Sequence, residues 1–205
     1  MSENQPIEFK GNFINGEFVV PQSNAIHFET YSPANLNEKT INVSTDIDHV
    51  NQACEAAHRA FVEWSALSIE NRMEILKKVQ AAFAAREEEF AQVISRETGK
   101  PLWETKTEAK AIVGKFTITF EHSLELIKEV RVENALPGVD GFVRYRPRGV
   151  FAVLGPFNFP AHLPNGHIVP ALVTGNCVVF KPSELTPATA QLMAQCFQDA
   201  GVPAG

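Results

Sequence analysis

The chain has 205 residues, 44% hydrophobic and 20% charged, a composition typical of folded globular proteins and sufficient for one sizeable core. Its formal net charge of -6 argues against a nucleic-acid partner, because affinity for the phosphate backbone depends on clustered Lys and Arg. No apolar run approaches the length that crosses a membrane, so no membrane association is expected.

The three cysteines, Cys54, Cys177 and Cys196, form no CxxC pair and no Cys/His cluster that could hold zinc. No metal is therefore expected, and the cysteine usage indicates a reducing, cytoplasmic compartment. Residues 1–10 are acidic and polar where a signal peptide would have a basic flank and an apolar stretch, which agrees with that compartment.

The first elements expected along the chain are a hairpin and a helix. The pair Asn15-Gly16 lies between apolar residues and readily takes the positive φ angles of a two-residue hairpin turn. After a loop through residues 32–35, the spacing of Thr45 and Asp48 is typical of a capping box at a helix start. Apolar residues then recur at helical spacing: Val50, Cys54, Ala57, Phe61 and Trp64.

Two longer helical patterns follow. The first covers about 68–98 and ends at Gly99, with residues 87–89 mostly facing water. Its apolar side is formed by Ile69, Met73, Leu76, Val79, Phe83, Phe90 and Ile94. The second covers about 101–129, and Pro101 suits its first helical position. Candidates for its buried face are Ile112, Phe116 and Leu124.

The pattern changes to strands after Pro137-Gly138. Residues 142–146 alternate apolar with basic, which predicts a half-exposed strand, and residues 150–154 are almost wholly apolar, which predicts a buried one. A helical stretch leads to a second apolar run at 177–180, and Thr186-Pro187 then opens a final helix as N-cap and first residue. This order of strand, helix, strand and helix predicts an α/β fold with a parallel sheet.

Two polar segments lie just past the ends of these strands, where open parallel sheets bind ligands. The first is Gly155-Pro156-Phe157-Asn158-Phe159-Pro160, in which two prolines hold a loop rigid around the carboxamide of Asn158. That group can donate hydrogen bonds to an oxyanion. In the alternative interpretation, Asn158 only caps a turn.

The second segment, Lys181-Pro182-Ser183-Glu184, places a cation and a carboxylate three residues apart. Such a pair suits a nucleotide ribose, because Lys181 can donate to sugar hydroxyls and Glu184 can accept from a free 2′-hydroxyl. Glu184 would also repel a 2′-phosphate, so NAD is expected in preference to NADP. The alternative is an exposed ion pair of little energetic consequence.

Together these segments resemble the aldehyde dehydrogenase superfamily, whose loop at the oxyanion asparagine usually reads Pro-Trp-Asn-Phe/Tyr-Pro and whose cofactor strand ends in Lys-x-x-Glu. The resemblance covers nearly the whole chain, with further matches at residues 14–17, 97–101 and 170–176. Phe157, in place of the usual Trp, and residues 161–170 resemble the succinylglutamate semialdehyde dehydrogenases. That subfamily oxidises N-succinylglutamate 5-semialdehyde to N-succinylglutamate during arginine degradation.

The resemblance implies an incomplete Rossmann-like parallel sheet. Residues 1–129 would form the N-terminal hairpin and the helical part of the cofactor-binding domain, residues 130–147 the oligomerisation strands, and residues 148–205 the first part of the NAD-binding sheet. In such enzymes a cysteine thiolate attacks the aldehyde, the oxyanion passes hydride to the nicotinamide, and water activated by a glutamate releases the acid.

The resemblance also assigns residues to roles. Asn158 matches the oxyanion donor, and Lys181 and Glu184 match the contacts to the adenosine ribose. The cofactor-contacting segment corresponds to Leu154, Gly155, Pro156 and Phe157. The substrate tunnel corresponds to Phe159, Leu163 and His167. A structural hydrogen bond is expected of His162 rather than a proton relay, whereas both roles stay open for His167.

The nucleophile is not expected within the chain. Each of the three cysteines is expected to be a small core residue, and none has the glycine-rich setting of the family's catalytic cysteine. The nucleophile, the deacylating glutamate and a Phe-Thr-Gly-Ser cofactor segment all lie further along the family pattern than Gly205. The chain is therefore expected to be the N-terminal portion of an aldehyde-oxidising homodimer or homotetramer, and to be inactive alone.

Two alternatives stay open. The parent enzyme could act on another semialdehyde, such as succinate or glutamate semialdehyde. The chain could instead be a non-enzymatic module that binds a nucleotide or associates with other subunits, because half of a parallel sheet leaves an unpaired strand edge and apolar surface.

Overall fold

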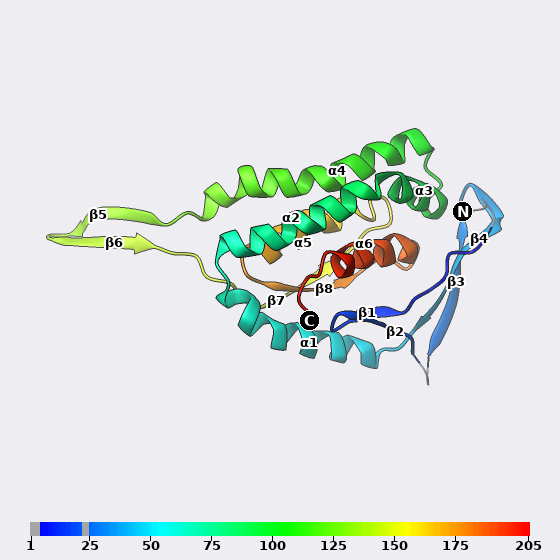
Figure 1. The fold of residues 1–205 in the computed structure, drawn as a ribbon, viewed down its shortest axis with the longest axis horizontal. Helices are drawn as coiled ribbons and strands as arrows, with labels where there is room; N and C mark the ends of the chain where they lie inside the picture. The colour runs from blue at the N-terminus through cyan, green and yellow to red at the C-terminus, as the bar shows by residue number, and fades with distance from the viewer. Residues whose placement is uncertain (1–4, 22–24) are drawn as a thin grey trace.

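The computed structural model describes residues 5–21 and 25–205, and Figure 1 shows its hairpins, helices and one parallel strand pair. The first hairpin joins β1 (Asn12–Ile14) to β2 (Glu17–Val19), with Phe13 opposite Phe18. Asn15 and Gly16 form its turn at φ 52° and 82°, which confirms the hairpin predicted from the Asn-Gly pair.

A second hairpin, which the sequence pattern does not indicate, joins β3 (Ile26–Ser32) to β4 (Asn35–Thr45). Only its turn coincides with the loop expected at residues 32–35. Most side chains of both strands are polar, and the apolar ones that reach the core are mainly Ile41 and Val43. Without a regular apolar alternation, the sequence carries little signal for a strand.

The capping box predicted at Thr45 and Asp48 is wrong. Thr45 is the last residue of β4, and helix α1 (Asp48–Ala66) begins with the Asp48 amide donating to Asp46 Oδ1 at 2.9 Å. The buried face of α1 consists of His49, Ala56, Ala57 and Trp64. Val50 and Cys54, which were expected on this face, are exposed instead, so the buried face of α1 differs in part from the predicted one.

Helices α2 (Ile69–Ala85), α3 (Glu87–Thr98) and α4 (Leu102–Glu121) build the main core. The first two replace the single helix expected over 68–98, because the helix breaks at Arg86. In a continuous helix Phe83 and Phe90 would lie two turns apart, about 10 Å. The break brings their ring centroids to 5.1 Å, in a stacked arrangement. Gly99, at φ 72°, ends α3 as predicted.

A hairpin projects away from the rest of the molecule (Figure 1). The helix expected to reach residue 129 ends at Glu121, and a short 3-10 helix, η1 (Ser123–Ile127), leads to β5 (Val130–Leu136) and β6 (Val139–Val143). Every residue of β5 is exposed. The strand predicted over 142–146 includes only the end of β6, because residues 144–146 are not in a strand.

The predicted order of strand, helix, strand and helix is confirmed by β7 (Val150–Leu154), α5 (His162–Val173), β8 (Cys177–Lys181) and α6 (Pro187–Asp199). The two strands pair in parallel, from Val150 opposite Cys177 to Leu154 opposite Lys181, and form a two-stranded sheet.

Helices cover both faces of this strand pair. Cys177 and Val179 of β8 pack in a cluster with Trp64 of α1, whereas Val178 and Phe180 pack against the main core on the other face. Figure 1 shows α1 on one side of β7 and β8, with α2 and α5 on the other. This layering is the arrangement expected of an α/β fold.

Strand β7 is less buried than the sequence predicts. Only Val153 is buried, while Phe151 is 42% and Leu154 75% exposed. Within residues 5–21 and 25–205, β7 pairs with β8 alone, so its second edge and much of its apolar surface stay open. No helix in the described part of the chain combines the length and apolarity that a bilayer crossing requires.

Candidate functional site

The two candidate segments meet at one edge of the parallel pair. Leu154 and Lys181 are the last partners in the register of β7 and β8, and the Gly155 amide continues the ladder by donating to the Lys181 carbonyl at 2.9 Å. The loop that carries Asn158 and the segment from Lys181 to Glu184 therefore leave the sheet side by side. The sequence places each segment at a strand end, and the parallel register brings them together.

Glycine is required at position 155 by close packing. A Cβ there would lie 2.8 Å from the Phe180 ring and 3.2 Å from Pro164 Cγ. The absence of a side chain lets the loop cross directly over the end of β8 and the start of α5. Prolines at 156 and 160 restrict the same loop on both sides of Asn158.

The side chains proposed to contact ligands lie on an open surface. Phe157 is 57% and Leu163 41% exposed, and Asn158 and His167 are also exposed. Among the described residues, none forms a hydrogen bond with the Asn158 carboxamide, so the turn-cap interpretation finds no support. The amide is free to donate to a ligand.

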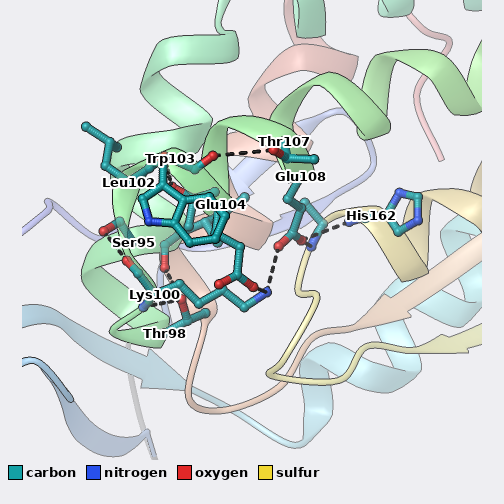
Figure 2. A network of polar contacts seen from close by, with 12 residues as sticks. Ser95, Thr98, Lys100, Leu102, Trp103, Glu104, Thr107, Glu108 and His162 are labelled. Carbon is teal, nitrogen blue, oxygen red and sulfur yellow. Dashed lines mark hydrogen bonds and ion pairs between the residues drawn. The ribbon is translucent and has the colours of Figure 1, made fainter.

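An ion pair of Glu108 and Lys100 lies beside the loop, and Figure 2 shows Glu108 between Lys100 and the backbone of His162. Glu108 of α4 is 1% exposed in its side chain, and its Oε1 accepts from the backbone amides of Ala161 and His162, both at 3.3 Å. Its Oε2 lies 3.4 Å from Lys100 Nζ, and that ammonium stands 3.7 Å from the centroid of the Phe159 ring. Glu108 thereby fixes the first turn of α5 to α4, and Lys100, just before α4, contacts Phe159, the residue after Asn158.

Sequence reasoning misses this role of Glu108. Lys100, Glu104 and Glu108 recur at four-residue spacing, and Lys100 pairs with Glu104 at 3.5 Å as well as with Glu108. This four-residue spacing is the one sequence signal that could have indicated the role of Glu108, but on its own it is typical of a solvated helix face. The backbone amides that Glu108 accepts from are 53 and 54 residues further along the chain, so local pattern cannot reveal them.

A second buried carboxylate supports the other segment. Glu97 of α3 accepts from the Ala188 and Thr189 amides, at 2.7 and 2.8 Å, in the first turn of α6. Thr186 holds the N-cap position predicted for it, but its side chain makes no capping hydrogen bond, and Glu97 supplies that cap instead. Residues 97–101, seen in the sequence only as a family match, thus support both loops of the site.

Lys181 and Glu184 form an ion pair at 3.1 Å, with side chains 62% and 68% exposed. Hydrogen bonds to Glu184 from its own backbone amide and from Lys181 lower the pKa of its carboxyl, so it is charged at neutral pH. An exposed pair of this kind contributes little to stability, and both partners can turn to ligand hydroxyls at small cost.

None of the three cysteines is a candidate nucleophile at this site. Cys177 and Cys196 are buried as predicted, and burial raises the pKa of both thiols, to about 12 for Cys196. Cys54 was predicted to be a core residue, but it is exposed on α1, which covers the opposite face of the strand pair from α5. None lies in the loop around Asn158.

The expectation for His162 is only partly met. Its backbone amide donates to Glu108, but Nδ1 of its ring is buried without a hydrogen-bond partner among the described residues. The ring lies 6.2 Å from the Phe159 ring, centroid to centroid. Burial, and secondly the charge of Lys115, lower the pKa of His162, so the imidazole is neutral at physiological pH.

Comparison with known proteins gives one consistent result. A profile described as "Aldehyde dehydrogenase family" matches residues 18–205. N-succinylglutamate 5-semialdehyde dehydrogenase of Photorhabdus laumondii is 42% identical over 97% of this chain and 40% of its own length. The protein of the same name from Paraburkholderia xenovorans is 49% identical over 79% of this chain and 33% of its own length.

Solved structures agree with this result. A 1-pyrroline-5-carboxylate dehydrogenase from Thermus with bound NAD is similar over 97% of this chain and 38% of its own, at a TM-score of 0.87 and 25% identity. An NADP-dependent enzyme of E. coli is similar over 95% of this chain and 40% of its own, at a TM-score of 0.87 and 30% identity. The chain spans about 40% of the length of the relatives it matches.

Proposed function

Because this chain belongs to the aldehyde dehydrogenase family, we propose that it forms the N-terminal, NAD-binding part of an enzyme that oxidises N-succinylglutamate 5-semialdehyde to N-succinylglutamate. The observation that carries the substrate proposal is the 42% identity to a dehydrogenase of that name over 97% of the chain. Phe157, which is exposed beside Asn158, and residues 161–170 support it, because both resemble the corresponding residues of that subfamily.

In this proposal Asn158 donates its side-chain N–H to the oxyanion that forms when a thiolate adds to the aldehyde. The exposed, unpartnered carboxamide and the rigid loop around it suit that role, because preorganised donors stabilise developing charge most effectively. Phe159, Leu163 and His167 would form one wall of the substrate tunnel. The thiolate and the base that activates water would come from residues outside this chain.

The cofactor proposal rests on the edge of the strand pair. NAD, when bound, supplies the hydride acceptor. Lys181 and Glu184 would hold its adenosine ribose, and the backbone of residues 154–157 would pass against it, since Gly155 leaves no side chain in the way. The negative charge of Glu184 disfavours a 2′-phosphate, which supports NAD over NADP.

The division of the chain follows the same proposal. Residues 1–129 and 148–205 would belong to the cofactor-binding domain, and residues 130–147 would join subunits into a dimer or tetramer. The projecting hairpin with its exposed β5 supports an association role, and the same feature favours the rival proposal of a non-enzymatic association module. Turnover by the whole protein distinguishes the two.

The substrate proposal is tested with the whole protein that carries this chain. NAD reduction is followed with N-succinylglutamate semialdehyde, glutamate semialdehyde and succinate semialdehyde. We expect the highest kcat/KM for the succinylated compound. A higher value for either of the other two would assign the enzyme to that semialdehyde, and no reduction with any aldehyde would reject the enzyme proposal.

A further inference from the structure

One lysine of α4 lies against a glycine of α5. The two helices are in contact here, because the Asn165 side chain donates to the Ile112 carbonyl at 3.0 Å. Lys115, three residues after Ile112, extends over Gly166, the residue after Asn165: its Cε and Nζ stand 3.5 and 3.8 Å from the point where a Cβ of Gly166 would lie. The ammonium therefore lies over bare backbone of α5.

The charge of Lys115 has no counterion in the described structure. Two lysines earlier in the same part of the chain do have counterions: Lys100 pairs with Glu108 at 3.4 Å, and Lys106 pairs with Glu88 at 3.1 Å. Lys115 forms no ion pair within residues 5–21 and 25–205, although it is partly buried. A partly buried cation without a counterion is unfavourable, and an anionic ligand would relieve that cost.

Glycine at 166 is not required by the fold. Its φ is not in the left-handed region, and a Cβ there would meet Lys115 only at ordinary van der Waals distance. Glycine inside a helix is destabilising relative to alanine. Gly166 therefore weakens α5 although packing does not require a glycine there. A ligand that uses the space above Gly166 would explain this choice of residue.

His162 adds a second polar atom without a partner beside this space, Nδ1 of its ring. It precedes Gly166 by one helical turn, so both face the same side of α5. Nδ1 of His162 is buried without a partner, and its ring contacts the ring of Phe159, the neighbour of Asn158. His162 is therefore adjacent both to the Lys115–Gly166 contact, one turn along α5, and to Phe159 in the loop that carries Asn158.

We propose that Lys115 and His162, across the bare surface of Gly166, bind a carboxylate of the aldehyde substrate. The proposal rests on the proposed function, in which the aldehyde group reacts beside Asn158. N-succinylglutamate semialdehyde carries two carboxylates and an uncharged aldehyde carries none. Lys115 supplies the charge, and the neutral imidazole of His162 donates a hydrogen bond when its proton is on Nδ1.

The kinetic test compares Lys115→Met with Lys110→Met in the whole protein. Lys110 is exposed on another face of α4, so its variant removes an equal charge without touching the site. We expect Lys115→Met to raise KM for the carboxylate-bearing aldehyde about tenfold, the usual effect of losing a charged hydrogen bond. Hexanal, which has no carboxylate, should keep its KM in both variants.

Two further variants separate recognition from stability. Lys115→Arg keeps the charge and should retain most of the wild-type KM. Gly166→Ala favours the helix but fills the space, so it should raise the same KM while the unfolding temperature rises or stays constant. Equal changes of KM for charged and uncharged aldehydes in Lys115→Met would overturn the proposal.

A binding test needs no turnover. Lysines of the whole protein are reductively methylated with and without N-succinylglutamate, and the modified positions are mapped by mass spectrometry. We expect protection of Lys115 and none of Lys110. Unprotected Lys115 would overturn the carboxylate site, whereas protection in a protein that oxidises no aldehyde would keep the site and reject only the proposed function.

Discussion

The Glu97 carboxylate on α3 accepts hydrogen bonds from both the amide and the hydroxyl of Thr189 on α6, at 2.8 and 2.7 Å. It thereby caps the helix that follows the Lys181 segment and ties the first half of the chain to the second. Burial raises the pKa of Glu97 to about 7, and the hydrogen bonds from Thr189 and Ala188 only partly oppose this shift.

This pKa predicts that the contribution of Glu97 to stability falls as pH rises. The folded protein keeps the proton up to about pH 7, whereas an unfolded chain releases it near the ordinary value of 4.5. The stabilisation is therefore complete below pH 4.5 and is lost as pH rises through 7. In urea unfolding, the free energy of unfolding of the wild type should fall by an amount on the order of 3 kcal/mol as pH rises from 4.5 through 7. The Glu97→Gln variant should not show this fall.

The control for this titration is Glu121→Gln, which alters an exposed carboxyl at the end of α4 and should keep the wild-type pH profile. If wild type and Glu97→Gln lose stability in parallel between these pH values, the carboxyl does not hold its proton in the folded protein.

Removing Glu108 should loosen the loop that carries Asn158. Glu108→Ala leaves the Ala161 and His162 amides and the Lys100 ammonium without their buried partner, which should cost about 2 kcal/mol of stability. Hydrogen exchange at both amides should accelerate. Glu104→Ala, which removes the more exposed partner of Lys100, should change stability by less than about 1 kcal/mol. Equal effects of the two variants would show that Glu108 does not position the loop.

Asn158→Ala should separate catalysis from folding. The side chain is exposed and makes no hydrogen bond to the described residues, so the unfolding free energy should change by less than about 0.5 kcal/mol. In the whole protein, loss of an oxyanion donor should lower kcat roughly 100- to 1000-fold while NAD binding stays constant. A kcat within a factor of two of wild type would remove Asn158 from the reaction.

The projecting hairpin gives a prediction about assembly. Val130 pairs with Val143 and lies on the same face of β5 as Val132, so these exposed apolar side chains form a small surface of their own. Val132→Lys in the whole protein should reduce the oligomer measured by light scattering. The control variant, Glu133→Lys, changes the charge on the opposite face of β5 and should leave the mass of the oligomer unchanged. An unaltered mass for Val132→Lys would place the subunit contact elsewhere.

The sequence predicts those parts of the structure that depend on local residues. Asn15-Gly16 specifies a turn by its own φ preferences, Gly99 ends a helix in the same way, and the apolar runs at 150–154 and 177–180 lie in the two parallel strands. The segments around Asn158 and Lys181 lie at adjacent strand ends, where such folds bind ligands, and their roles in binding stay predictions.

The features that the sequence does not predict depend on partners far along the chain. Glu97 and Glu108 are 91 and 53 residues from the amides that they accept from, and nothing nearby distinguishes them from solvated carboxylates. The exposure of Phe151 has a similar origin, because an apolar run indicates a strand without indicating how many neighbours cover it. The prediction for Cys54 is wrong because the buried face of α1 consists of His49, Ala56, Ala57 and Trp64, and Cys54 lies outside it.

The proposed NAD site at the carboxyl ends of β7 and β8, with Lys181 and Glu184 as the ribose contacts, can be measured by calorimetric titration of the 205-residue chain. We expect NAD to bind, NADP to bind roughly tenfold more weakly, and Glu184→Ala to reduce that difference. No heat at millimolar NAD would show that these strand ends do not bind the cofactor, and equal affinity of the wild-type chain for NAD and NADP would show that Glu184 does not select between them.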